Sequence, residues 1–373
     1  MLTVMVTSQL AIEWKLSPHG SGSRRHGTFL HACLICTLAV LQALLLVTAG
    51  CGTSATCASD GRLGAQDDER LCVISSGIRE AIDRSLQSGS AEEAAVWLVR
   101  ASDGSSLSRN DPSGLLVSDI YPGGLIRPLI LAALLDSGAS SDEVYDAPDW
   151  YTGAITIGSP PTRILDAELW TRATMSDIVS RRLNVVLIEL AETRLGGDGL
   201  VAALIDFGLT AQYDVRANRL NRLNRATIVI GQQYAYSPQS ILAAYGILAG
   251  DGRDRLGSQV VLSSSARSVR SILRSAVTDS GGYLHTLHGR TVRSLAAVNG
   301  CAPARVEGED GSLGYGRRVS CSAIVLYPAS DPTFVVMAVS VSSAEEFERG
   351  AREHRDAATL LAGDVIALVE QSM

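Results

Sequence analysis

Few side chains in this sequence combine the type and the spacing that covalent catalysis requires. Lysine is absent after Lys15, so any mechanism that needs a lysine amine in the C-terminal part of the chain is excluded. Other candidate nucleophiles and bases lie in predicted loops and lack the spacing of a serine, histidine and aspartate triad: Ser113, Ser118, Tyr121, His285 and His288. Cys301 is a better candidate nucleophile than these residues, because a thiol is intrinsically more nucleophilic than a hydroxyl group.

The composition indicates a globular protein with a substantial core. The chain has 373 residues, of which 46% are hydrophobic and 19% are charged, and this allows one large domain or two ordinary ones. The net charge is −7, and no cluster of basic residues follows the N-terminal region. Because binding to nucleic acid is driven by clustered cations, we exclude nucleic acid as the main partner.

An apolar stretch near the N-terminus is long enough to span a bilayer. Phe29–Ala49 contains no Asp, Glu, Lys or Arg, and a membrane helix needs about 20 residues. Lys15, Arg24 and Arg25 precede it and acidic residues follow it, so the positive-inside rule places the N-terminus in the cytoplasm. We therefore predict a protein of the cell membrane with its large C-terminal part on the extracytoplasmic side.

The predicted organisation has four parts: a cytoplasmic segment at 1–28, a transmembrane anchor or signal at 29–50, a linker at 51–70 and a domain at 71–373. A lipoprotein is the alternative to a retained anchor, because Thr48–Cys51 (TAGC) resembles a bacterial lipoprotein cleavage box with Cys51 as the lipidated residue. Both alternatives tether the domain to the outer face of the membrane.

The cysteines can form disulfides in an exported protein. We predict the pairs Cys57 with Cys72 and Cys301 with Cys321. A zinc site is the alternative, but no C-x-x-C spacing with nearby histidines accompanies these four cysteines. We therefore expect neither a metal nor a cofactor.

Tyr121–Gly138 (YPGGLIRPLILAALLDSG) is the helix around which we expect the domain to be organised. Gly123 and Gly124 permit a tight turn, Pro128 suits an early helical position, and apolar residues recur at spacings near 3.6. The pattern predicts a buried helix whose N-terminus lies at a surface or a cleft.

Other elements are predicted from the same signals. Residues 71–89 indicate a short strand followed by a helix, 94–108 a strand ending in a turn at Asp103-Gly104, and 142–166 an irregular segment. Further helices are expected at 175–196, 199–209 and 237–252, then strands within 292–306, 317–329 and 331–343, and a closing helix from Arg349 to Ser372. This order predicts an α/β sandwich, with an antiparallel sheet flanked by helices.

Several of these stretches, in this order, resemble the transpeptidase domain of penicillin-binding proteins. These serine acyltransferases cross-link peptidoglycan and share a fold with serine β-lactamases. Tyr121–Gly138 is similar to the family's nucleophile helix, usually PGSxxKP, and residues 230–252 (IGQQYAYSPQSILAAYGILAGDG) to its GxGxxxTPxQ stretch and the following helix. The resemblance covers roughly residues 71–373 and implies the transpeptidase fold.

The resemblance also implies three motifs, SxxK, SxN and KTG, whose serine attacks a carbonyl and whose neutral lysine takes up the proton. Aligned on Pro122-Gly123, Gly124 stands at the serine position and Arg127 at the lysine position. Glycine has no nucleophile, and a guanidinium with a pKa above about 12 cannot serve as a base. The resemblance therefore predicts an inactive pair.

The other two motifs are degenerate as well. Of Arg182-Leu183-Asn184, which stands where SxN is expected, only Asn184 remains, and an asparagine before an apolar helical run is more often a helix cap. Cys301-Ala302-Pro303 stands where KTG is expected, and its proline removes a backbone donor at a strand edge.

We therefore predict a non-catalytic, membrane-tethered, transpeptidase-like protein that binds cell-wall synthesis proteins or peptidoglycan stem peptides. Arg127 and Arg182 could make the cleft cationic and bind a carboxylate, or they could simply be solvated. One rival hypothesis is a divergent acyl transferase or hydrolase that uses Cys301 or a histidine. Another is a lipoprotein sensor lipidated at Cys51.

Overall fold

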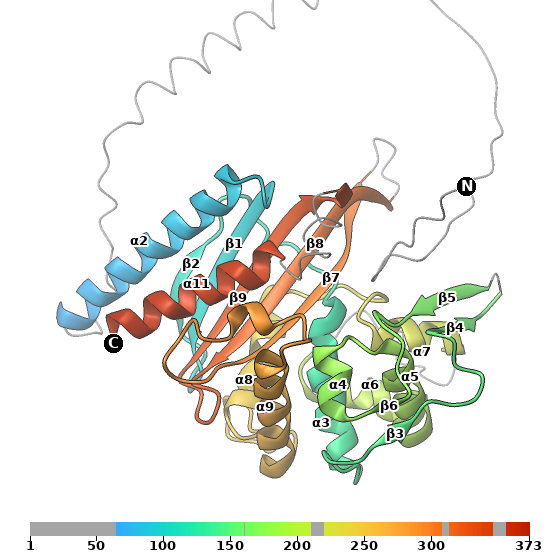
Figure 1. The fold of residues 1–373 in the computed structure, drawn as a ribbon. Coiled ribbons are helices and arrows are strands. Elements are labelled where there is room, and N and C mark those ends of the chain that lie inside the picture. Colours follow the sequence, from blue (N-terminus) through green and yellow to red (C-terminus); the bar gives the residue numbers. More distant parts are fainter. Residues whose placement is uncertain (1–64, 160, 210–219, 308–312, 346–355) are drawn as a thin grey trace, which may run out of the picture. The chain divides into compact units, whose positions relative to one another are not determined.

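An antiparallel sheet of five strands organises the unit that includes Val73–Met373 (Figure 1). The computed structural model describes residues 65–159, 161–209, 220–307, 313–345 and 356–373. The strand order is β2-β1-β9-β8-β7, and every neighbouring pair is antiparallel. In chain order the strands are β1 (Glu93–Arg100), β2 (Ser106–Asn110), β7 (Ala296–Glu307), β8 (Leu313–Tyr327) and β9 (Phe334–Ser343).

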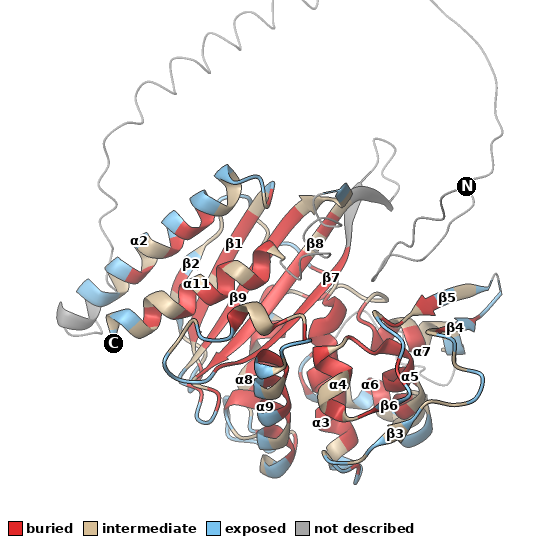
Figure 2. Ribbon diagram, in the orientation of Figure 1, coloured by how far each residue is buried: buried red, intermediate tan, exposed pale blue. Residues whose placement is uncertain are grey.

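Helices cover both faces of the sheet, so its middle strands are buried on both sides (Figures 1 and 2). In β9, every residue from 335 to 341 is buried. The covering helices are α2 (Ala65–Gln87) and α11 (Ala357–Ser372) on one face, and α8 (Pro238–Ala249) and α9 (Ser263–Thr278) on the other. This arrangement confirms the predicted α/β sandwich of an antiparallel sheet flanked by helices.

A second group of helices surrounds α3, the helix predicted to be central. Every residue of α3 from Arg127 to Leu134 is buried, because α3 packs against α9, α6 and α4. The elements of this group are η1 (Gly123–Ile126), α3 (Arg127–Asp136), α4 (Met175–Ser180), α5 (Asn184–Leu190), η2 (Ala191–Leu195), α6 (Gly196–Asp206) and α7 (Arg222–Val229). Two small sheets, β3 (Tyr145–Asp146) with β6 (Arg172–Ala173) and β4 (Ala154–Ile157) with β5 (Thr162–Leu165), accompany it.

Helix α8 fixes the turn that leads into α3. As predicted, Ser237 caps α8, since its side chain accepts from the Ser240 amide, and Pro238 takes an early helical position. The buried Tyr245 of α8 donates its hydroxyl to the Leu125 carbonyl oxygen at 2.6 Å. Because this carbonyl belongs to η1, the bond joins the start of α3 to α8, one of the helices that cover the sheet.

Three predicted elements were wrong in part. Residues 71–74 belong to α2 and not to a short strand; Ile74, Ile78 and Ile82 are buried at helical spacing. The run 175–196 is broken, because Arg182 adopts a positive φ of 54° between α4 and α5. The segment 142–166, predicted to be irregular, contains the strands β3, β4 and β5.

The predicted N-terminal anchor at 29–50 and the lipidation candidate Cys51 lie outside the described residues. No helix among the residues that the structure describes is both long enough and apolar enough to cross a bilayer. The anchor and the lipoprotein alternative therefore remain predictions from the sequence.

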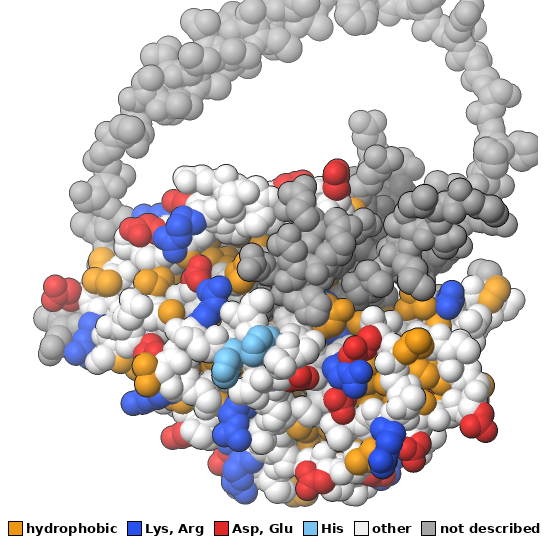
Figure 3. All heavy atoms as spheres, viewed as in Figure 1, with side chains coloured by type: hydrophobic (Ala, Val, Ile, Leu, Met, Phe, Trp, Pro, Cys, Tyr) orange, Lys and Arg blue, Asp and Glu red, His pale blue; other side chains and the backbone are white. Residues whose placement is uncertain are grey.

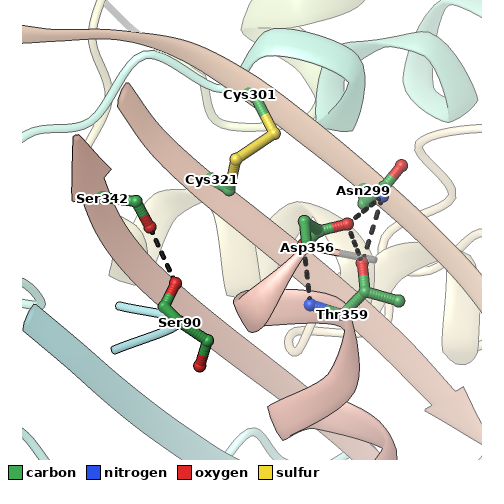
Figure 4. Close-up of a disulfide and its surroundings, with 7 residues drawn as sticks. All are labelled: Ser90, Asn299, Cys301, Cys321, Ser342, Asp356 and Thr359. Atoms are coloured by element: carbon green, nitrogen blue, oxygen red, sulfur yellow. Dashed lines mark hydrogen bonds between the residues drawn. A yellow bond between two sulfur atoms is a disulfide. The ribbon is translucent and has the colours of Figure 1, made fainter. Parts of the chain in front are cut away.

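Strands β7 and β8 are joined by the predicted disulfide between Cys301 and Cys321 (Figure 4). The two residues are direct partners in the antiparallel register, and both are buried. The bond closes a loop with a sequence separation of 20 residues. The other predicted pair includes Cys57, which lies outside the described residues, so that pairing stays a prediction.

Removing this disulfide should lower the stability of the domain. A loop of this length implies a loss of about 3 kcal/mol in the free energy of unfolding, because the cross-link restricts the unfolded chain. We expect this loss for the double variant Cys301→Ala/Cys321→Ala in urea unfolding followed by circular dichroism. An unchanged unfolding midpoint, together with thiols at both positions that react in the unfolded wild type, would show that the bond does not form.

Candidate functional site

The entrance of helix α3 lies directly against strand β7, main chain to main chain. A β-carbon at Gly124 would lie 2.3 Å from the Asn299 carbonyl oxygen, closer than real β-carbons approach. A β-carbon at Gly300 would lie 2.2 Å from the Gly124 amide nitrogen and 2.5 Å from the Pro122 carbonyl oxygen. Glycine is therefore required at both positions, and nothing larger than hydrogen fits between the two backbones here.

A third segment closes the same turn from another side. The Gly123 amide donates to the Gly231 carbonyl oxygen at 3.0 Å, and a β-carbon at Gly231 would lie 2.2 Å from the Gly123 carbonyl oxygen. Gly123 and Gly231 both have positive φ, 50° and 71°. The predicted tight turn is thus real, and it is packed on two sides by other segments of the chain.

Arg127 fills the space beside Gly124. Its side chain is only 2% exposed, and its Nη2 donates to Oδ1 of Asn184 at 2.9 Å. Its Nη1 lies 2.9 Å from the place where a β-carbon of residue 124 would stand. Burial, and next the neighbouring Arg182, lower the pKa of Arg127 to about 9, so the guanidinium keeps its charge near neutral pH.

Asn184 links its own helix to two other elements and does not cap a helix, which corrects the prediction. It is the first residue of α5, with Leu183 at the cap position, and its Nδ2 donates to the Leu165 carbonyl oxygen at 2.7 Å. Its Oδ1 is the acceptor for Arg127. Asn184 therefore connects α3, α5 and β5.

A buried carboxylate that the sequence analysis missed satisfies the start of α5. Asp166 accepts from the Val185 amide at 2.7 Å, from Tyr151 Oη at 2.6 Å and from Trp170 Nε1 at 2.7 Å. Burial raises the pKa of Asp166, and these hydrogen bonds oppose that rise. Asp166 is also an electrostatic partner of Arg127.

Arg182 is also buried, but it does not line the cavity beside Gly124. It is 3% exposed, and its guanidinium carbon lies 3.9 Å from the ring centroid of Tyr283. Burial lowers the pKa of Arg182, and Asp356 partly offsets this effect. Neither Arg127 nor Arg182 is solvated, so that part of the prediction was wrong.

The predicted cleft positions converge only in part, on a cavity of about 30 Å³. Of the predicted positions Gly124, Arg127, Arg182, Asn184, Cys301, Ala302 and Pro303, those that line it are Gly124, Arg127, Asn184 and Cys301. Its other lining residues are Thr162, Arg163, Ile164, Leu165, Thr227, Ile230 and Gln232. A volume of this size holds about one or two water molecules, so a substrate-sized group does not fit in it.

Three of the alternative candidates, Cys301, His285 and His288, have other contacts. Cys301 is bonded to Cys321, and a disulfide sulfur is not a nucleophile. His285 and His288 stack on each other with ring centroids 5.2 Å apart, and neither lines the cavity. The polar residue of β7 nearest the site, Asn299, turns toward α11, where its Nδ2 donates to Asp356 and Thr359 (Figure 4).

Comparison with known proteins agrees with the resemblance noted in the sequence. The family model of the penicillin binding protein transpeptidase domain matches residues 99–359. The chain belongs to the penicillin-binding protein transpeptidase family. No curated protein sequence matches it.

Solved structures show the fold of this transpeptidase-like domain. The apo transpeptidase domain of penicillin-binding protein 3 from Burkholderia pseudomallei superposes with a TM-score of 0.66 at 16% identity, over 80% of this chain and 93% of that one. A peptidoglycan glycosyltransferase from Burkholderia ambifaria gives 0.62 at 18% identity, over 79% and 94%. A peptidoglycan synthetase from Bifidobacterium adolescentis gives 0.63 at 15% identity, over 80% and 60%. These structures confirm the predicted fold.

The closure at Gly124 can be tested by adding one methyl group. Gly124→Ala should lower the free energy of unfolding by about 2 kcal/mol, because the methyl group overlaps the Asn299 carbonyl oxygen. Gly246→Ala in α8 is the matched control, since no atom lies within 4 Å of its β-carbon position. The control should change stability by no more than about 1 kcal/mol, and in the stabilising direction. Equal urea-unfolding curves for both variants would mean that the two backbones are not in contact.

Proposed function

We propose that this transpeptidase-like protein is catalytically inactive and acts as a binding or scaffold partner in peptidoglycan synthesis in the bacterial cell envelope. The observation that carries the proposal is the direct packing of η1 on β7 through Gly124 and Gly300. Acyl transfer needs a nucleophile, a base and room for the acyl group between them. Residue 124 has no side chain, and backbone atoms occupy the space beside it.

The base position supports the same conclusion. Arg127 donates to Asn184 and carries a proton at neutral pH, since its pKa of about 9 lies well above 7. A guanidinium in this state cannot accept the proton of a hydroxyl group. A serine introduced at residue 124 would therefore meet a cation instead of the neutral amine that the family's chemistry needs.

A binding role fits a domain whose framework is kept while its cleft is closed. The match covers 93% of the transpeptidase domain from Burkholderia pseudomallei, so the sheet and its covering helices are present nearly in full. On the face drawn in Figure 3, acidic and basic side chains are interspersed, which suits contacts with proteins better than with a polyanion. Cell-wall synthesis proteins are the partners that this proposal favours.

Fluorescent penicillin tests the catalytic part of the proposal. The wild-type protein should form no covalent adduct under conditions in which an active penicillin-binding protein is labelled. The variant Gly124→Ser/Arg127→Lys should also stay unlabelled, because the Asn299 carbonyl oxygen occupies the space that the new side chain needs. Circular dichroism would establish that the variant is folded. A fluorescent band in either protein, if excess unlabelled penicillin competes it away, would contradict the proposal.

The tether is tested separately. The protein should fractionate with membranes, and a reporter that is active only outside the cytoplasm should be active when fused after Met373. Deleting residues 29–50 should abolish both properties. Cys51→Ala distinguishes the two kinds of tether, since it would release a lipoprotein but leave a transmembrane anchor in place. A cytoplasmic reporter signal from the full-length fusion would contradict export.

A further inference from the structure

The small cavity beside Gly124 has an unbalanced set of charged side chains. Two of the residues that line the cavity are arginines, Arg127 and Arg163. No lining residue is an aspartate or a glutamate. Arg127 is buried and Arg163 is exposed, and both residues line the cavity. A space with this lining attracts negative charge and repels positive charge.

Arg127 has hydrogen-bonding capacity that the described residues leave unused. Only its Nη2 has a hydrogen-bond partner there, which is Asn184, and its buried Nε has none. A buried guanidinium normally satisfies most of its five N–H groups. The unused donors of Arg127 therefore call for an acceptor next to the cavity.

The charge of Arg127 is not compensated by a direct ion pair among the described residues. Asp166 raises the pKa of Arg127 through its charge, but the oxygens of Asp166 accept from Tyr151, Trp170 and the Val185 amide. Arg182 adds a second buried positive charge nearby. An unpaired buried cation is costly, and a bound counter-ion removes most of that cost.

We propose that this cavity binds one small monovalent anion, either a halide ion or a single carboxylate group, between Arg127 and Arg163. The volume of about 30 Å³ suits an ion of this size and is too small for a phosphate ester or a peptide. Gln232 also lines the cavity, and its side-chain amide would supply a further donor. The proposal does not depend on whether the protein is catalytically inactive.

Thermal unfolding of the full-length protein in detergent tests the site. We would titrate sodium chloride, sodium acetate or sodium gluconate at constant ionic strength. A saturable rise in the unfolding temperature with chloride identifies a halide site, and a rise with acetate alone identifies a carboxylate site, because a ligand that binds only the folded state stabilises it. Gluconate is too large for the cavity and should have no saturable effect. Identical responses to all three salts would overturn the proposal.

Two variants locate the site. Arg163→Gln should weaken the apparent affinity for the stabilising anion about tenfold, a change equivalent to about 1.4 kcal/mol. Arg274→Gln is the matched control: Arg274 is exposed on α9, outside this cavity, and its loss changes the net charge by the same amount. The control should leave the affinity unchanged. Equal affinities for the two variants would place the anion elsewhere and overturn the assignment.

A third variant supplies the missing negative charge from the protein itself. Gln232→Glu places a carboxylate on the cavity wall without changing the size of the side chain. It should raise the unfolding temperature in the absence of chloride and abolish the saturable response. The line width of the ³⁵Cl resonance, which broadens when chloride exchanges with a protein site, should lose its protein-dependent part in the same variant. Retention of both signals in Gln232→Glu would overturn the proposal.

Discussion

Close packing of two backbones, at Gly124 and at Gly300, is the constraint on which the rest of the site depends. Any side chain at either position would separate η1 from β7, since the β-carbon positions lie 2.2–2.3 Å from main-chain atoms of the facing segment. Because η1 leads directly into α3, and α3 packs against α4, α6 and α9, this contact also sets the position of the helical group relative to the sheet. The contact between η1 and β7 is therefore part of the domain's core packing.

The side chains around this contact are adapted to it. The guanidinium of Arg127 lies beside the entrance of α3, with its Nη1 2.9 Å from the β-carbon position of residue 124. Asn184 accepts one of its N–H groups and uses its own amide to reach β5. A polar residue that the resemblance associates with a catalytic motif thus supports a buried charge instead. Arg127 and Asn184, which differ in sequence context from the family's motifs, are thus connected by hydrogen bonds in the structure.

Much of the fold could be predicted from the sequence, because several of its elements have strong local signals. The β-branched runs of β8 and β9 and the glycine entrance of α3 carry local signals that tertiary packing reinforces, and the disulfide follows from two cysteines on neighbouring strands. The strand expected at residues 71–74 failed because an apolar run of four residues suits a strand or a helix equally. Helix α9 was not predicted, although its buried residues Ala266, Val269, Leu273 and Ala276 recur at helical spacing.

The site itself could be predicted only as a set of positions. Sequence identified Gly124 and Arg127, but whether an arginine is solvated or buried depends on contacts between segments far apart in the chain, such as that with Asn184, 57 residues away. Asp166 gave no local signal, since its three donors come from Tyr151, Trp170 and Val185. Gly124 and Arg127, which the resemblance aligns with the family's serine and lysine, also lie next to each other in space. Nη1 of Arg127 lies 2.9 Å from the β-carbon position of residue 124, so a side chain at 124 would crowd the guanidinium as well as the Asn299 carbonyl oxygen. A substitution at either position is therefore expected to disturb the packing of the other.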